Sequence, residues 1–106
     1  MAKIFAKGAL QNVSTVSTLY TTPASTTSVV IGCLITNVDA SATIRVTVDW
    51  DNGSGVITNL VKATPVLAGA AIEVIEGKLV LLTTEFIRVT VTGGLADATA
   101  SVLENT

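Results

Sequence analysis

The residues best equipped for chemistry lie in one polar stretch, Asp49-Trp-Asp-Asn-Gly-Ser-Gly55. Asp49, Asp51 and Asn52 offer the hard oxygen ligands that Ca²⁺ prefers. No Glu follows at the position where an EF-hand loop supplies its bidentate ligand. Asn52-Gly53 is also the strongest short signal for a β-hairpin turn. We therefore interpret the stretch as a hairpin tip and predict no metal site, leaving open whether Asp49, Asp51 and Asn52 bind Ca²⁺.

Most nucleophilic and acid–base chemistry is removed by the absence of His and the presence of one Cys. There is no imidazole base at neutral pH, and a single thiol builds neither a Cys-rich zinc site nor an intrachain disulfide. Cys33 lies in an apolar run, where a buried thiol is inert. Gly53-Ser-Gly55 lacks the strand-to-helix setting of a nucleophile elbow, and Gly93-Gly94 joins strand to strand rather than cradling a phosphate. We predict no catalytic residue, no cofactor and no enzyme activity.

Two further pairs of side chains are candidates for a functional site. Glu73 and Glu76 are three positions apart, which places them on opposite faces of a strand, so they are interpreted as solvated edge charges. Trp50 and Tyr20 would suit a sugar-stacking platform, but the chain has only two Phe, one Tyr and one Trp. Trp50 also lies on an apolar strand face and is interpreted as core. A carbohydrate-binding β-sandwich is kept as the alternative function of another class.

The elements that position these residues are strands. The chain holds 17 Thr, 15 Val and 8 Ile in 106 residues, and such β-branched side chains favour a pleated sheet. Apolar and polar residues alternate in short runs, with turn signals every 8–12 residues. We predict a single all-β domain over residues 1–106, an antiparallel β-sandwich of jelly-roll type with about eight strands.

Individual strands follow from the same alternation. Ala42 to Trp50 is predicted to form a hairpin with Val56 to Ala63, and Pro65 is predicted to end the second strand. Ser28 to Asn37 is apolar on both faces, which predicts a strand covered on both sides, with a bulge at Gly32.

The two ends of the chain are read in the same way. Ile87 to Val91 and Ala98 to Val102 alternate around Gly93-Gly94, which predicts a closing β-hairpin. The preceding run, Ile72 to Leu82, is predicted to bend at Glu76-Gly77. Residues 1–12 are less regular and are interpreted either as an edge strand or as an arm that reaches a neighbour.

The charge content indicates what surrounds the domain. Only 13% of residues are charged, against about 25% in typical domains, and 49% are hydrophobic. Since a small solitary domain usually keeps its surface charged, we expect other subunits to cover part of this one. The six basic residues are scattered and the net charge is −2, which argues against nucleic-acid binding. No apolar window is long enough to span a membrane, and the first residues lack the apolar core of a signal peptide.

Two segments, Leu19 to Asn37 and Pro65 to Glu104, together resemble small virion structural proteins of tailed bacteriophages. One departure is Thr84-Glu85, where the usual family copy has Gly-Asp before its Ile-Arg strand. The resemblance is carried by Tyr20-Thr-Thr-Pro-Ala24, Gly77-Lys-Leu-Val-Leu81, Phe86-Ile-Arg-Val89, Gly93-Gly94 and Ser101-Val-Leu-Glu104.

The resemblance implies a β-sandwich that works through interfaces, so no functional residue is carried over from the family. It implies a role in the virion without indicating the location within it. The low charge, the strands that are apolar on both faces and the irregular residues 1–12 lead us to predict a capsid decoration or cement protein, made in the host cytoplasm. We expect a homo-oligomer, a homotrimer first, that contacts the major capsid protein or other virion proteins. The alternative within the virion is a tail, fibre-base or head–tail adaptor subunit.

Overall fold

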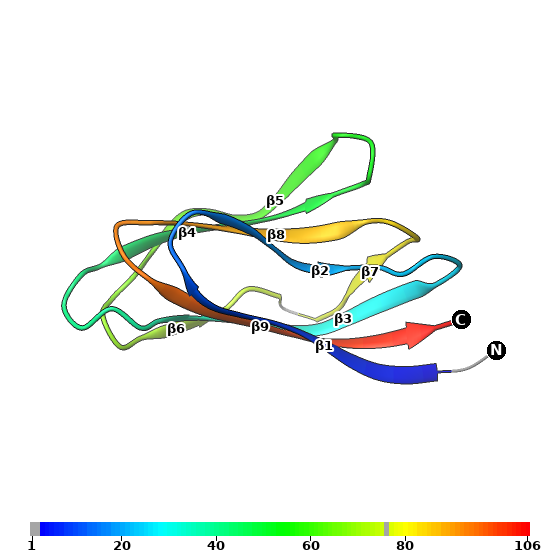
Figure 1. Ribbon diagram of the computed structural model, residues 1–106, viewed down its shortest axis with the longest axis horizontal. Coiled ribbons are helices and arrows are strands. Elements are labelled where there is room, and N and C mark those ends of the chain that lie inside the picture. The colour runs from blue at the N-terminus through cyan, green and yellow to red at the C-terminus, as the bar shows by residue number, and fades with distance from the viewer. Residues whose placement is uncertain (1–2, 76) are drawn as a thin grey trace.

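Two antiparallel sheets packed face to face make up the protein (Figure 1). The computed structural model describes residues 3–75 and 77–106, and that part of the chain contains strands and no helix. The first sheet has the order β1-β9-β3-β6, with β7 also paired to β3, and the second sheet has the order β2-β8-β4-β5. Among the described residues, no helix is long and apolar enough to cross a membrane.

Nine strands fill eight positions in the two sheets, because β7 and β6 pair with successive parts of β3. β7 pairs with residues 28–30 and β6 with residues 34–36, so the two short strands together form one edge. The strands are β1 (Lys3–Val13), β2 (Val16–Thr21), β3 (Thr27–Asn37), β4 (Ile44–Asp51), β5 (Ile57–Val66), β6 (Ala71–Glu73), β7 (Leu79–Leu81), β8 (Phe86–Thr92) and β9 (Ala96–Asn105).

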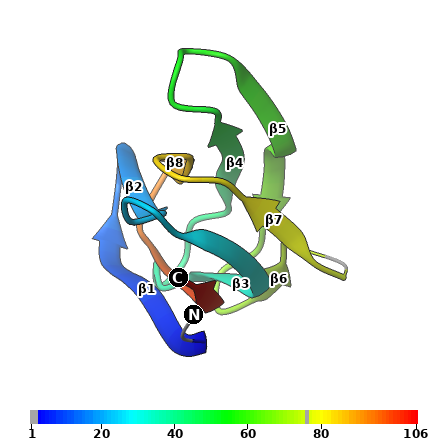
Figure 2. The ribbon, with the colours of Figure 1, turned by 90° about the vertical axis from the view of Figure 1, so that its right-hand side faces the viewer.

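The order of the strands is that of a jelly roll. The chain passes between the sheets at every connection except those from β4 to β5 and from β6 to β7. Two sheets of four positions, wound in this way, are the double Greek key of jelly-roll domains. Viewed along its length, the sandwich is closed where β1 lies beside β2, and β5 curves away from the opposite side (Figure 2). The predicted fold class is confirmed.

The predicted closing hairpin is wrong. β8 lies in the second sheet and β9 in the first, so the two strands do not pair with one another. Gly93, with φ +88°, turns the chain from one sheet to the other. The alternation in both strands was read correctly, since Val89 and Ala98 are buried between the sheets. Alternation identifies the buried face of a strand but not its neighbour. Two consecutive strands with buried faces can pair in one sheet, or they can lie in opposite sheets and face each other across the core.

The other predicted hairpin, from β4 to β5, is confirmed, but its second strand extends beyond Ala63 and through Pro65. Pro65 is tolerated because β5 is an edge strand, where a missing N–H leaves no ladder partner unsatisfied. The ladder is irregular here. The Ala63 N–H donates to Thr47 Oγ1, and Arg45 Nη1 donates to the Ala63 carbonyl. Such bulges and prolines discourage edge-to-edge pairing with another chain.

Residues 3–12 lie in β1, the edge-strand alternative that the sequence left open. Gly8 is buried where β1 meets the start of the second sheet, and a Cβ atom at this position would lie 2.3 Å from the Leu19 carbonyl oxygen. Only glycine permits this approach of the two backbones. The predicted bend at Glu76-Gly77 lies between β6 and β7, where Gly77 has φ +94° and Glu76 is outside the described residues.

We expect Gly8→Ala to lower the free energy of unfolding by about 1–3 kcal/mol, because a backbone contact cannot yield as a flexible side chain would. Gly32→Ala is the matched control in the same sheet. Its nearest new neighbour is the flexible Glu73 carboxylate at 3.7 Å, so its effect should stay within about 0.5 kcal/mol. Urea unfolding of both variants measures the difference, and an equal effect at the two glycines would contradict the close-approach argument.

Candidate functional site

The most unusual surface is the outer face of the first sheet, where four apolar side chains form a row across β1, β9, β3 and β7. Phe5 on β1 is in register with Leu103 on β9, Leu103 with Val29 on β3, and Val29 with Val80 on β7. Phe5 is 79% exposed and Val80 53%, while Val29 and Leu103 are half-buried between them. A large aromatic side chain left this exposed is rare unless another molecule covers it.

Two further side chains widen this row. The register of β3 against β9 shifts between Val30 and Gly32, so the predicted bulge is confirmed and Ile31 is left exposed. Leu82 follows the buried Leu81 and is also exposed. We call the six residues Phe5, Val29, Ile31, Val80, Leu82 and Leu103 the apolar face.

The apolar face corrects one prediction about β3. Its sequence is apolar on both faces, and the expectation was a strand covered on both sides. Val30, Cys33 and Ile35 are buried between the sheets, but the opposite face of β3 carries Ile31 and Leu34 in the open. In the isolated chain, therefore, only one face of this central strand is covered.

Charged groups flank the apolar face. Lys3 and Lys7 are exposed on β1 at either side of Phe5. On the other edge, Glu73 Oε1 accepts a hydrogen bond of 2.8 Å from the Cys33 N–H, which places that carboxylate beside the β3 bulge. Glu73 was predicted to be an edge charge, and this contact adds a backbone partner. The companion residue, Glu76, lies outside the described residues.

Smaller apolar groups are exposed elsewhere on the molecule. Val56 and Ile57 lie at the tip of the β4–β5 hairpin, which curves away from the sandwich (Figures 1 and 2). Val38, Leu67 and Leu95 lie in the loops at the end of the sandwich, where the Val38 N–H donates to the Leu95 carbonyl. Apolar groups are therefore exposed on several sides of this small domain.

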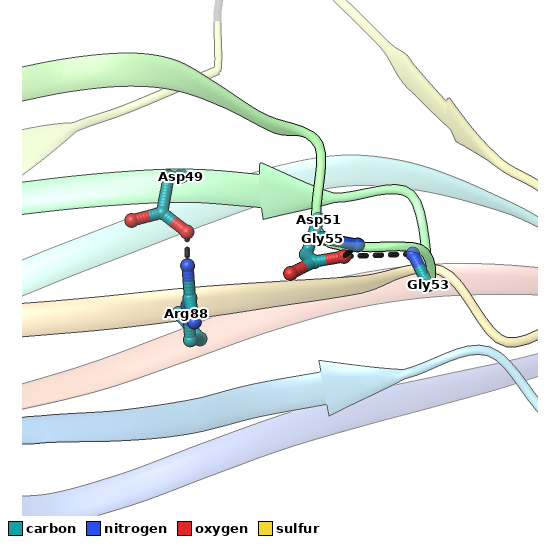
Figure 3. Close-up of polar contacts among 5 residues, drawn as sticks. All are labelled: Asp49, Asp51, Gly53, Gly55 and Arg88. Carbon is teal, nitrogen blue, oxygen red and sulfur yellow. Dashed lines mark hydrogen bonds and ion pairs between the residues drawn. The ribbon is translucent and has the colours of Figure 1, made fainter.

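The aspartates considered as Ca²⁺ ligands are engaged in internal contacts (Figure 3). Asp51 Oδ1 accepts hydrogen bonds from the N–H groups of Gly53 and Gly55, at 2.8 and 3.4 Å. An aspartate that bonds to backbone N–H groups a few residues later stabilises a turn. Asp49 Oδ1 accepts from Arg88 Nε at 3.1 Å, across the β4–β8 ladder. Within residues 3–75 and 77–106, no group of three or more Cys, His, Asp or Glu is placed to hold a metal ion.

The candidate sugar platform does not form. Tyr20 is buried, and its hydroxyl group bonds to Ser28 Oγ at 2.8 Å and donates to Glu104 Oε2. Trp50 packs against the core, as predicted. With Tyr20 buried and Trp50 partly buried against the core, the two rings do not form an exposed pair for stacking on a sugar.

Cys33 is a core residue, as the sequence indicated. Its side chain is buried and unpaired with another Cys. Burial, with a smaller contribution from the nearby Glu73 charge, raises the pKa of the Cys33 thiol to about 12. The thiol is therefore protonated at neutral pH, and a protonated thiol is a poor nucleophile.

The polar link through Tyr20 was not foreseen from the sequence. It joins β2 of the second sheet to β3 and β9 of the first, and Ser28 is fully buried. A lone Tyr at the end of a Ser- and Thr-rich run carries no signal of a partner 84 positions away.

No family model and no curated protein matches the chain. Solved structures, in contrast, share its fold. A chain in the acidic stable capsid of the Helicobacter pylori bacteriophage KHP30 superposes with a TM-score of 0.61 at 10% identity, covering 100% of this chain and 94% of that one. A chain of the disulfide-linked pili that form Bacillus endospore appendages gives 0.57 at 13% identity, covering 99% and 87%.

A third similar structure is the particle of infectious bursal disease virus, with a TM-score of 0.55 at 9% identity. The match covers 96% of this chain but 30% of the viral chain. At these identities the likenesses establish the jelly-roll fold, and they include viral capsid proteins and a pilus protein.

We expect Tyr20→Phe to lower the free energy of unfolding at neutral pH by about 1–3 kcal/mol, because it leaves the buried Ser28 hydroxyl and Glu104 without their partner. Burial, then the bond to Glu104, raises the pKa of Tyr20 from 10.0 to about 12. A raised pKa in the folded state adds stability that is complete below pH 10 and is lost as the pH rises toward 12.

Urea unfolding between pH 7 and pH 12 measures both effects. Wild type should lose more stability than Tyr20→Phe in the alkaline range. Both proteins lose the contribution of Cys33 equally, because the pKa of its thiol is raised in both. Parallel curves for the two proteins would contradict the role given to Tyr20.

Proposed function

We propose that this protein is a structural subunit of a bacteriophage virion, and specifically a capsid decoration or cement protein. The observation that carries the proposal is the apolar face. A chain with 13% charged residues exposes a row of apolar side chains across a whole sheet, which is the surface of a subunit that other proteins cover.

The comparison with the KHP30 capsid supports the virion as the location. The superposition covers 94% of that chain, so the similar capsid chain is also a small jelly roll rather than a large protein that contains one. A capsid chain of this size fits an accessory component on a shell, and the sequence resemblance to small tailed-phage virion proteins points to the same class.

The proposed mechanism is stabilisation by preferential binding. A subunit that contacts two neighbouring capsomers binds the assembled shell and not its separated parts, so each bound copy shifts the equilibrium toward the shell. Bridging requires contact surfaces on more than one side. The exposed apolar groups at the hairpin tip and in the loops around Val38 and Leu67 provide such surfaces in addition to the apolar face.

The polar groups of the chain support a role without chemistry. Asp49, Asp51 and Tyr20 are each bonded within the fold, and Cys33 is buried. We therefore assign the protein to assembly rather than catalysis, with itself and the major capsid protein as its partners. The homotrimer favoured from the sequence remains part of this proposal.

A second candidate is a tail or fibre subunit. The similarity to the Bacillus endospore pili, which covers 87% of the pilus chain, favours it because a jelly roll of this size also builds a surface fibre. The two candidates differ in copy number. Decoration of a shell needs copies on the scale of the major capsid protein, whereas a tail or neck ring needs far fewer.

Quantitative mass spectrometry of the virions that carry this chain tests the proposal. We expect the chain at a copy number comparable to that of the major capsid protein, and we expect shells depleted of it to lose their genome at a lower temperature. Adding back purified wild-type protein should restore the original temperature. The matched control is the virion's own major capsid protein, measured in the same sample.

A copy number on the scale of a single ring would move the protein to the tail or neck. Absence of the chain from purified virions would contradict the proposed function altogether.

A further inference from the structure

We propose that the apolar face is a self-contact, in which two copies of this chain pack their first sheets face to face about a two-fold axis parallel to the strands. The inference starts from β3. This strand is apolar on both faces, and the fold covers only one of them. The same outer face continues over β1, β9 and β7, so the uncovered surface spans the full width of the sheet.

The order of side chains in the row makes it complementary to itself. Phe5 lies at one edge and Val80 at the other, with Leu103 and Val29 between them. With a two-fold axis parallel to the strands, the rows of the two copies face each other and run in opposite directions. Phe5 of one copy then covers Val80 of the second copy, and Leu103 covers Val29. Large side chains thus meet smaller ones, as interdigitated sheet packing requires at its spacing of about 10 Å.

The charges select this axis over the other in-plane choice. An axis across the strands, centred on the row, would place Lys3 of one copy opposite Lys7 of the other, and like charges in contact are unfavourable. The axis parallel to the strands instead places Lys7 at the level of the β3 bulge of the second copy. The Glu73 carboxylate lies beside that bulge, bonded to the Cys33 N–H, so it approaches Lys7. The exposed Lys78, just before β7, lies at the same edge, so Lys7 meets one opposite and one like charge there, against like charges alone with the other axis.

The size of the sheet's outer face fits a weak contact. Strands of about ten residues and a width of four strands give roughly 33 Å by 14 Å, or about 450 Å² on each copy. The total of about 900 Å² is just below the ~1,000 Å² of a stable specific contact, in the range of transient contacts. We therefore expect a dimer that forms reversibly in solution. The bulged, proline-bearing edge at β5 is a poorer place for self-association.

This inference shares the apolar face with the proposed function, but it alone requires a second copy of the chain on that face. A monomeric protein in solution would overturn the two-fold contact and leave the virion assignment to the copy-number measurement. Absence from virions would overturn the virion assignment and leave the two-fold contact in place.

Site-specific cross-linking tests the contact. Packed sheets hold opposite Cα atoms about 10 Å apart, beyond the reach of a direct disulfide, so a short bis-maleimide is the suitable reagent. Phe5→Cys and Val80→Cys are prepared as separate full-length proteins and mixed. We expect the cross-linked heterodimer, identified by intact mass, to exceed the Phe5→Cys homodimer at least tenfold. Native Cys33 is buried, so wild type supplies the blank.

Val16→Cys provides the matched control, because Val16 is exposed on β2 in the other sheet. Its mixture with Phe5→Cys should give no more product than random collision. Circular dichroism of each variant confirms that the fold is intact. Equal yields in all mixtures would overturn the proposal, and a dominant Phe5→Cys homodimer would overturn the choice of axis.

Discussion

The fold depends on how closely its two sheets approach along the edge where β1 meets β2. Gly8 makes this approach possible, since a Cβ atom there would lie 2.3 Å from the Leu19 carbonyl oxygen. Its partner in the ladder is Ala100, another small residue, and the next inward-facing residue of β1, Leu10, also pairs with an alanine, Ala98. Small side chains on β1 and β9 thus leave room for the larger residues of the facing sheet. A few ångströms of backbone clearance decide whether the inner faces can be buried together.

Once the inner faces are buried, the properties of the outer faces decide what the molecule can do. The polar side chains that were candidates for a site form hydrogen bonds within the fold. Asp51 accepts hydrogen bonds at the hairpin tip, Asp49 pairs with Arg88, and Tyr20 links the two sheets. The longest row of exposed apolar side chains lies on the outside of the first sheet, and smaller apolar groups are exposed at the hairpin tip and in the loops. Such a row fits the proposed role of a structural subunit, which acts by contact with other proteins.

Sequence patterns predicted the fold class because period-two alternation reports directly which side chains face a core. The same patterns located the β4–β5 turn at Asn52-Gly53 and the bulge at Gly32. They could not assign strand neighbours, so β8 and β9 were wrongly joined in a hairpin. They also could not reveal the apolar row, because Phe5, Leu103, Val29 and Val80 come together only through the register of four strands distant in sequence. In the sequence, only the apolar character of β3 on both faces indicates this surface, and the same pattern also predicts a strand whose two faces are both buried.

We infer that another copy of the chain covers the apolar face. Multi-angle light scattering of the purified protein over a wide range of concentration tests it most directly, beside Phe5→Lys, which places a charge on the most exposed residue of the face. We expect the wild-type mass to rise above the 10.8 kDa of one chain as concentration increases, while Phe5→Lys stays nearer to that mass. A wild-type protein that remains at 10.8 kDa at every concentration, or a variant that assembles as wild type does, would contradict it.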